Sequence, residues 1–285
     1  MTVAAIPILS SIAELASSCD AWIVDIWGVI HNGARAHQAA CDACETFRAG
    51  GGTVALLSNA PRPFTDVIVQ LDRLGVPRAA YDFGVTSGDV TRGMLAELWR
   101  GRSVLHIGPE RDKGLFEGLD VRLVGADAAE IALCSGLYDD TKETPESYAE
   151  LFQRLLARRV PMICANPDLV VERGDKLVYC AGALAAAYEA EGGEVAYAGK
   201  PHKAIYERTL AAIAKAKGHP VARERILAIG DGIETDLKGA HGADLRSLFI
   251  ASAVHVPGGL DAATLIELFG HRPFAPVAAM PALAW

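Results

Sequence analysis

Short runs of apolar and β-branched residues alternate with helix-like segments along almost the whole of this 285-residue chain. Such alternation is typical of β–α–β units, in which a helix returns the chain to the edge of the sheet where the next parallel strand starts. The clearest strand patterns cover residues 22–26, 53–57, 104–107 and 225–229. We therefore predict an α/β fold, with a parallel sheet that has helices on both faces.

The composition limits the partners that this chain can have. Hydrophobic residues make up 51% and charged residues 22%, which describes an ordinary globular protein rather than a disordered one. The net charge of −8 argues against a nucleic-acid partner and against an anionic membrane surface. No apolar run reaches the roughly 20 residues that span a bilayer. We expect a cytoplasmic protein with no nucleic-acid or membrane partner.

Polar groups follow four of the expected strands. They are Asp25, Ser58, Lys200, and Asp231 with Asp236. Open α/β sheets bind their ligands at the carboxyl ends of their strands, so these groups are expected to gather at one edge. A carboxylate can accept a phosphoryl group, and Mg²⁺ prefers a few carboxylates together with water and phosphate. A lysine and a serine can hold the phosphate oxygens, so the pattern favours Mg²⁺-assisted phosphoryl transfer.

Four ordered motifs also resemble a known family. They are Asp25-x-Trp27-Gly28-Val29, Leu56-Leu57-Ser58-Asn59, Gly199-Lys200-Pro201 and Gly230-Asp231-x-x-x-Thr235-Asp236. In this order they resemble the motifs of the haloacid dehalogenase-like (HAD) superfamily. The stretch Cys164-Ala165-Asn166-Pro167-Asp168 resembles subclass IIA, which contains phosphatases of sugar and nucleotide monophosphates. The likeness covers nearly the full length.

The resemblance implies a Rossmann-like core with an α/β cap inserted between the second and third motifs. The strand–helix pattern restarts near Arg102, which agrees with this arrangement. We place the core at residues 1–100 and 197–285 and the cap, which would choose the substrate, at residues 101–196.

The resemblance also implies roles for particular residues. Asp25 would be the nucleophile, and Mg²⁺ would be bound by Asp25, the backbone carbonyl of Trp27 and Asp231, with help from Asp236. Lys200 would assist catalysis, and Ser58, Asn59 and Lys200 would hold the phosphate of a small phosphorylated metabolite. Asn166 and Asp168 would either contact the substrate or form a turn.

Trp27 departs from the family pattern. The phosphatases of the family have a second Asp two residues after the nucleophile, and it protonates the leaving group and then activates water. Trp27 can do neither, and general acid–base catalysis is typically worth about 10²–10⁴-fold. His31 is a candidate substitute, with a solvent-facing loop histidine as the other interpretation.

Two function classes follow from these observations. The first is a Mg²⁺-dependent phosphatase that forms an aspartyl-phosphate on Asp25 and has altered acid–base chemistry. The alternative is a catalytically weak descendant that binds a phosphorylated metabolite and regulates another process. Residues 225–229 give the last strong strand pattern, and the apolar tail at 273–285 is interpreted as a packing segment or as the contact of a homodimer.

Overall fold

The computed structural model describes residues 6–173, 176–251, 256 and 259–285. Contacts between Cα atoms divide the chain into two compact units. The first unit comprises Met1–Ser58, Ile68–Val85 and Tyr206–Trp285, and the second comprises Asn59–Val67 and Thr86–Ile205. The predicted division into a core and a cap at residues 101–196 stays a prediction.

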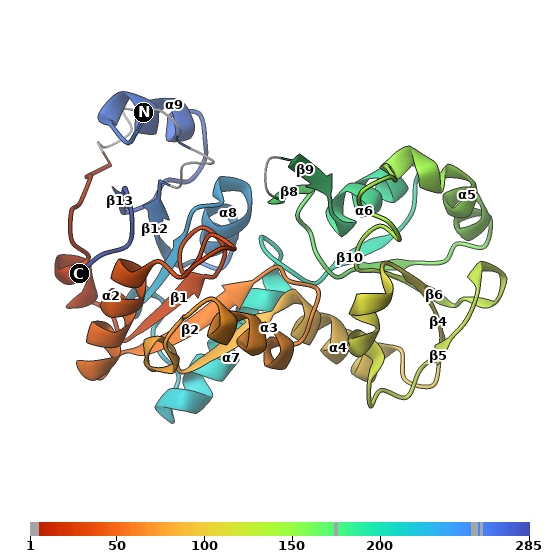
Figure 1. Ribbon diagram of the computed structural model, residues 1–285, viewed down its shortest axis with the longest axis horizontal. Helices are drawn as coiled ribbons and strands as arrows, with labels where there is room; N and C mark the ends of the chain where they lie inside the picture. Colours follow the sequence, from red (N-terminus) through yellow and green to blue (C-terminus); the bar gives the residue numbers. More distant parts are fainter. Residues whose placement is uncertain (1–5, 174–175, 252–255, 257–258) are drawn as a thin grey trace. The chain divides into compact units, whose positions relative to one another are not determined.

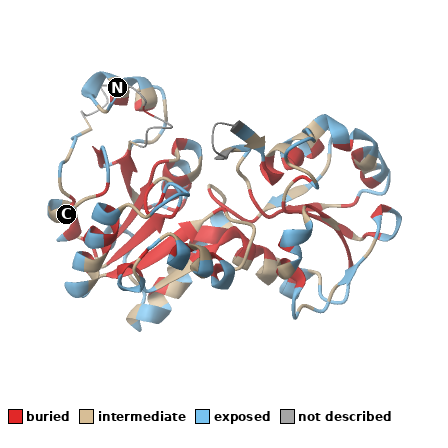
Figure 2. Ribbon diagram, viewed as in Figure 1, coloured by how far each residue is buried: buried red, intermediate tan, exposed pale blue. Residues whose placement is uncertain are grey.

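The first sheet has six strands, and it is built around β1. Its order is β13 (Ala278–Met280), β12 (Arg246–Ile250), β11 (Ile226–Gly230), β1 (Ala21–Asp25), β2 (Thr53–Ser58) and β3 (Phe83–Thr86). β1 pairs in parallel with β2 and with β11, and all five of its residues are buried (Figure 2). An apolar run with neighbours on both sides and on both faces is how a central parallel strand reads in sequence.

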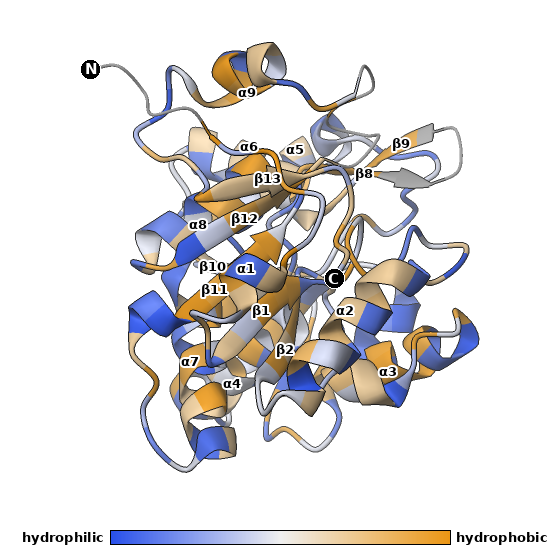
Figure 3. Ribbon diagram, turned by 90° about the vertical axis from the view of Figure 1, so that its left-hand side faces the viewer, coloured by the Kyte–Doolittle hydropathy of each residue, from blue (hydrophilic) through white to orange (hydrophobic). Residues whose placement is uncertain are grey.

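Helices cover this sheet on both faces. Figure 3 shows α2 (Gln38–Ala49) on one side of the strands and α7 (Lys203–Lys217) with α8 (Lys238–Gly242) on the other. On the α2 side, the ring of Trp22 stacks on Phe47 with 3.9 Å between centroids. Trp22 is fully buried, so this face of β1 is closed by aromatic packing.

The second sheet has five parallel strands (Figure 1). Its order is β10 (Val195–Tyr197), β7 (Met162–Cys164), β6 (Ile131–Cys134), β4 (Ser103–Ile107) and β5 (Arg122–Leu123). A separate antiparallel hairpin consists of β8 (Val170–Arg173) and β9 (Lys176–Tyr179).

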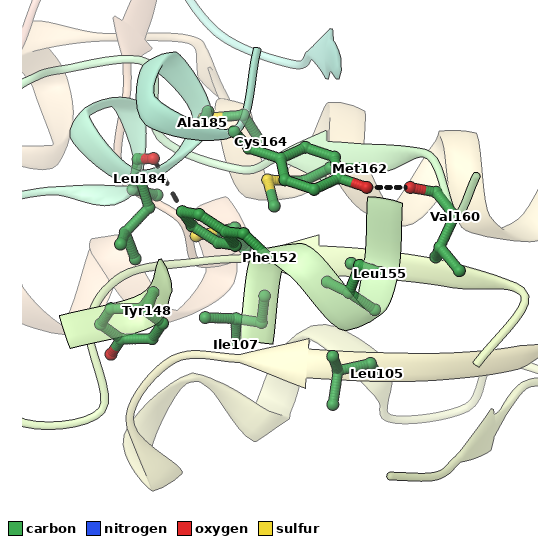
Figure 4. Packing of buried hydrophobic residues seen from close by; sticks show 14 of the residues in the cluster. Leu105, Ile107, Tyr148, Phe152, Leu155, Val160, Met162, Cys164, Leu184 and Ala185 are labelled. Atoms are coloured by element: carbon green, nitrogen blue, oxygen red, sulfur yellow. Dashed lines mark hydrogen bonds between the residues drawn. The ribbon is translucent and has the colours of Figure 1, made fainter. Parts of the chain in front are cut away.

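The two faces of the second sheet have different apolar clusters. One face packs on α5 (Ala149–Ala157) and α6 (Ala181–Ala190), where Phe152 and Leu184 meet Ile107 (Figure 4). The other face packs on α4 (Ser87–Leu98) and on the 3₁₀ helix η2 (Glu110–Phe116), through Leu95 and Leu115. Successive strand residues point to opposite faces, so this sheet is covered on both sides as well.

Shorter or peripheral helices complete the described chain. They are α1 (Ala13–Ala16), α3 (Phe64–Arg73), α9 (Ala262–Phe269), the 3₁₀ turns η1 (Arg78–Ala80), η3 (Ala126–Ala128), η4 (Pro145–Tyr148) and η5 (Arg223–Arg225), and the π-helix η6 (Ile233–Leu237). None of the helices in the described ranges combines the length and the apolar character needed to cross a lipid bilayer.

The fold is the predicted one, α/β with parallel sheets and helices on both faces, but its last two strands differ from the sequence analysis. The pattern at residues 225–229 is not the last core strand, because β12 and β13 extend the sheet beyond β11. The tail that we interpreted as a packing segment contains β13, whose three residues are all buried. This edge strand pairs with β12, and the Ala- and Pro-rich composition of the tail gave no strand pattern that would have predicted it.

Candidate active site

Three buried carboxylates gather in the first unit. Asp25 is the last residue of β1, Asp231 directly follows β11, and Asp236 lies on η6. Each is at most 7% exposed, and one carboxylate oxygen from each lies within 4.8 Å of the others. β1 and β11 are parallel neighbours, so the carboxyl ends of both strands are at the same edge of the sheet. The structure therefore brings together the three acids that the sequence predicted as a group.

The backbone after β1 is shaped to admit Asp231. The amide of Ile26 donates to Oδ1 of Asp25 (2.8 Å), which orients that carboxylate. Gly28 has a φ of +87°, and a Cβ on this residue would overlap the carboxylate of Asp231. Gly28 is thus needed both for its left-handed conformation and for the close approach of Asp231.

Asp236 is held by its own helix. Its Oδ2 accepts hydrogen bonds from the amide of Gly232 (3.2 Å) and from the hydroxyl of Thr235 (3.4 Å). A Cβ on Gly230 would overlap the side chain of Asp236, so this position also has to be small. The Tyr206 hydroxyl donates to the backbone carbonyl of Asp236 (3.0 Å) and anchors η6 on α7. A π-helical turn of this kind is frequent at functional sites.

The chemistry of the cluster fits a divalent cation. Three carboxylates that are almost excluded from water repel one another when they are ionised, and a cation between them offsets this repulsion. All three donors are hard oxygen atoms, which suit Mg²⁺ or Ca²⁺ better than softer metals.

Trp27 lies on the surface beside this cluster's strand. Its side chain is 46% exposed. The indole covers Gly33, where a Cβ would overlap the ring, and it meets the imidazole of His31 edge-on with centroids 5.3 Å apart. Two contacts therefore fix the indole and leave much of it accessible.

His31 is buried, contrary to the interpretation of a solvent-facing loop histidine. It is 2% exposed, and its Nδ1 accepts a hydrogen bond from the amide of Gly33 (3.0 Å). Burial, with a smaller effect of His37, lowers the pKa of His31 to about 4. At neutral pH the imidazole holds no extra proton that it could give to a leaving group.

In the second unit, Asn59 joins two other segments of the chain. Its Oδ1 accepts from the amide of Lys200 (2.7 Å), and its Nδ2 donates to the carbonyl of Lys200 (3.1 Å) and to Oδ1 of Asp168 (2.8 Å). Both Asn59 and Lys200 are buried. These bonds hold the Lys200 backbone, and the motif alone did not indicate this role for Asn59.

Asn166 and Asp168 form the turn that the sequence allowed. Oδ1 of Asn166 accepts from the amide of Asp168 (3.1 Å), which is the geometry of an Asx turn. The amide of Gly182, in the first turn of α6, donates to the Asp168 carbonyl (3.2 Å). The Asp168 side chain also reaches Asn59, so the turn is tied to the segment that follows β2.

Ser58 has a simpler placement. It is the last residue of β2, and the preceding residue, Leu57, pairs with Asp25. The chain then passes directly from Ser58 in the first unit to Asn59 in the second. Of the predicted site residues, Asp25, Trp27, Ser58, Asp231 and Asp236 belong to the first unit, and Asn59, Asn166, Asp168 and Lys200 belong to the second.

Family models match both ends of the chain. A haloacid dehalogenase-like hydrolase model matches residues 22–122, and a HAD-hydrolase-like model matches residues 197–274. A search of curated proteins finds no match.

Several solved structures are similar to this chain. A haloacid dehalogenase-like hydrolase from Brucella suis is 46% identical, with a TM-score of 0.85, over 97% of this chain and 100% of that one. A 4-nitrophenylphosphatase from Thermotoga maritima is 21% identical, with a TM-score of 0.71, over 94% and 96%. A possible sugar phosphatase from Cytophaga hutchinsonii is 18% identical, with a TM-score of 0.77, over 96% and 97%. The last two likenesses concern the fold.

Three observations agree with one another. They are the ordered motifs, the carboxylate cluster at the ends of β1 and β11, and the full-length match at 46% identity. This chain belongs to the haloacid dehalogenase-like hydrolase family, and its fold is that of the subclass IIA 4-nitrophenylphosphatases.

Proposed function

We propose that the protein is a Mg²⁺-dependent phosphatase of small phosphorylated metabolites and that it forms an aspartyl-phosphate on Asp25. The observation that supports this most strongly is the cluster of Asp25, Asp231 and Asp236, whose oxygens lie within 4.8 Å of one another. Similar folds in proteins described as a 4-nitrophenylphosphatase and a possible sugar phosphatase support the same class of substrate.

In the proposed reaction, a carboxylate oxygen of Asp25 attacks the phosphorus atom. The bond from phosphorus to the leaving oxygen breaks, and the leaving group departs with the electron pair. Water then attacks the acyl phosphate and releases inorganic phosphate, which regenerates the carboxylate. Mg²⁺ held by Asp25, the Trp27 carbonyl and Asp231, with support from Asp236, would offset negative charge on the phosphate.

Phosphate binding is assigned in this proposal to Ser58, Asn59 and Lys200, with Asn166 and Asp168 as substrate contacts. The hydrogen bonds of Asn59 to both backbone groups of Lys200 favour a positioning role for Asn59. Lys200 would then supply the positive charge, and Asn59 would keep its backbone in place.

Trp27 is expected to change which substrates react well. An indole cannot protonate a leaving alkoxide, and the low pKa of His31 makes that residue a poor substitute. Aryl and acyl phosphates have leaving groups that depart without a proton, so they should react faster than alkyl phosphates.

The test is phosphate release from p-nitrophenyl phosphate with and without Mg²⁺. Asp25→Asn should reduce the rate by at least about 10³-fold, because it removes the nucleophile. Asp20→Asn is a matched control, since Asp20 precedes the same strand at its other end and pairs with Arg225. Chelation of the metal should stop the reaction, and a rate that Asp25→Asn leaves unchanged would refute the proposal.

Trp27 supports a second candidate function, a catalytically weak protein that binds a phosphorylated metabolite and regulates another process. Trp27→Asp distinguishes the two. Recovery of fast turnover of alkyl phosphates would show a site that lacks only its acid. Tight metabolite binding with no turnover, in the wild type and in Trp27→Asp alike, would favour the regulatory function. A cytoplasmic location and a homodimer stay predictions.

A further inference from the structure

The second sheet has a point at which its chain order reverses. From β4 the chain moves outward to the edge strand β5, and it then returns to β6 on the other side of β4. Leu115 of η2 packs on one face of this sheet, and Phe152 of α5 packs on the other. The connections that leave β4 and β6 therefore go to opposite faces. In open parallel sheets such a reversal leaves a crevice at the carboxyl ends of the two strands, and ligands bind there.

A cavity of about 470 Å³ lies at this point, entirely within the second unit. Its size is within the range of sites for small molecules. Residues from β4 and its loop, from η2, from the end of β5 and from the loop after β6 line it: His106, Gly108, Pro109, Glu110, Lys113, Leu123, Val124, Gly125 and Tyr138. None of them belongs to the proposed phosphatase site.

One wall of the cavity has hydrogen-bonding capacity. Nε2 of His106 lies 2.9 Å from Oγ of Ser135, which is itself 4% exposed. The Ser135 hydroxyl also stabilises the carboxylate of Asp112, whose pKa burial raises. With Ser135 directed toward Asp112, Nε2 of His106 donates to Ser135, and Nδ1 keeps a lone pair. Nδ1 has no hydrogen-bond partner among the residues that the structure describes, so it can accept from a ligand.

Another wall is a rigid aromatic ring. Tyr138 is 46% exposed, and it stacks on Tyr148 with centroids 5.6 Å apart. The Tyr148 hydroxyl accepts from the amide of Tyr138 (2.7 Å), and its ring continues into the core through Phe152 (Figure 4). The hydroxyl of Tyr138 donates to the carbonyl of His106 (3.3 Å). Because its position is fixed before any ligand arrives, Tyr138 can stack a flat ring at low entropic cost.

The charges at the cavity cancel. Among the described residues that line it, Lys113 and Glu110 are the charged ones, and they form an ion pair with each other at 2.7 Å. Burial lowers the pKa of His106 to about 4, so the imidazole is neutral at pH 7. A phosphate group would find no free cation among these lining residues, whereas an uncharged ligand would lose little on leaving water.

We propose that this cavity binds a neutral, flat heterocycle of the nucleoside class, stacked on Tyr138 and donating a hydrogen bond to His106. Leu123, which is 45% exposed, and Val124 provide the apolar surface that such a ring needs. Gly108 allows the ring of His106 and the Ser135 hydroxyl to come this close, since a Cβ there would overlap both.

The test is calorimetric titration of the full-length protein with adenosine, guanosine, uridine and cytidine. Tyr138→Ala should weaken binding of the best nucleoside by about tenfold or more. Its backbone amide still reaches Tyr148, so the loop should remain folded. Tyr179→Ala is the matched control, because Tyr179 has similar exposure (42%) on β9 and does not line the cavity.

A second variant blocks the cavity without removing any contact. A Cβ on Gly125 meets nothing within 4 Å, so Gly125→Leu should fold normally and abolish nucleoside binding. The proposal fails if no nucleoside binds, or if binding survives in Tyr138→Ala and Gly125→Leu. It also fails if Tyr179→Ala weakens nucleoside binding as much as Tyr138→Ala does, because the loss would then not come from the cavity. None of these outcomes depends on phosphatase activity.

Discussion

The two parallel sheets of this protein have the same kind of architecture but end in opposite kinds of chemistry. At the ends of β1 and β11, three buried carboxylates lie within 4.8 Å of one another, which suits a divalent cation. At the ends of β4 and β6, His106 and Ser135 form a neutral hydrogen-bonded wall beside Tyr138. Strand topology therefore decides where a ligand can bind, and the side chains at the strand ends decide its charge.

The largest expected effects come from the core of each unit. Phe152 in the second unit and Phe249 in the first are each about fully buried, and each packs against a second aromatic ring at 5.3–5.4 Å. Replacing either by Ala should lower the free energy of unfolding by about 3–5 kcal/mol. Phe152→Ala should weaken nucleoside binding more than metal binding, and Phe249→Ala should do the reverse. Calorimetry of both ligands on both variants measures this, and equal losses would show that the two sites depend on one core.

One buried histidine, His31, and one half-buried histidine, His106, should make both units sensitive to acid. Burial lowers the pKa of both His31 and His106 from 6.5 to about 4, so the unfolded chain binds more protons between these values. The contribution of each neutral histidine to the free energy of unfolding is therefore fully present above pH 6.5. It is lost as the pH drops toward 4, and the loss is at most about 3 kcal/mol for each residue. Denaturant unfolding from pH 7 to pH 4 checks this. His31→Gln and His106→Gln should each reduce the dependence of the free energy of unfolding on pH. The same dependence in a variant as in the wild type would contradict the lowered pKa of the histidine that was replaced.

The carboxylate site should need a glycine at position 28 for its lack of a Cβ as well as for its positive φ. Gly28→Ala adds a Cβ that overlaps Asp231, at a φ of +87°. We expect phosphatase activity to fall about 100-fold, or about 2.7 kcal/mol, because the carboxylate must move. Gly51→Ala is the matched control, with a φ of +90° and nothing within 4 Å of the new Cβ. It should lose stability but keep activity, and similar losses of activity in the two variants would refute the steric explanation.

The smallest effect is expected at Asn59. Asn59→Ala removes three hydrogen bonds to Lys200 and Asp168 and leaves the Lys200 backbone groups without these partners. We expect a loss of about 1–3 kcal/mol in stability, together with a higher KM for p-nitrophenyl phosphate. Nucleoside binding should stay as in the wild type. A higher KM without a fall in kcat would indicate positioning of the phosphate ligand, and an unchanged KM would remove Asn59 from the proposed site.

Much of the fold could be predicted because strands and helices have local periodicity. The central strand β1 is an apolar run, and the alternation of strand and helix patterns predicted the parallel sheets. Because parallel strands end at the same edge of a sheet, the acids that follow them were expected to gather there. β12 and β13 were missed as core strands. β13 has only three residues and lies in an Ala- and Pro-rich tail that does not read as a strand. The residues it pairs with on β12 lie far from it along the chain.

The sequence by itself determined an α/β protein of parallel sheets, the three acids that gather at strand ends, and the unusual Trp27 after the candidate nucleophile. Only the tertiary structure decided that His31 is buried, that Asn59 holds the backbone of Lys200, and that a neutral cavity forms between the loops after β4 and β6. The physical reason is that periodicity depends on neighbours along the chain. Burial, strand order and the meeting of distant loops depend on how the whole chain packs.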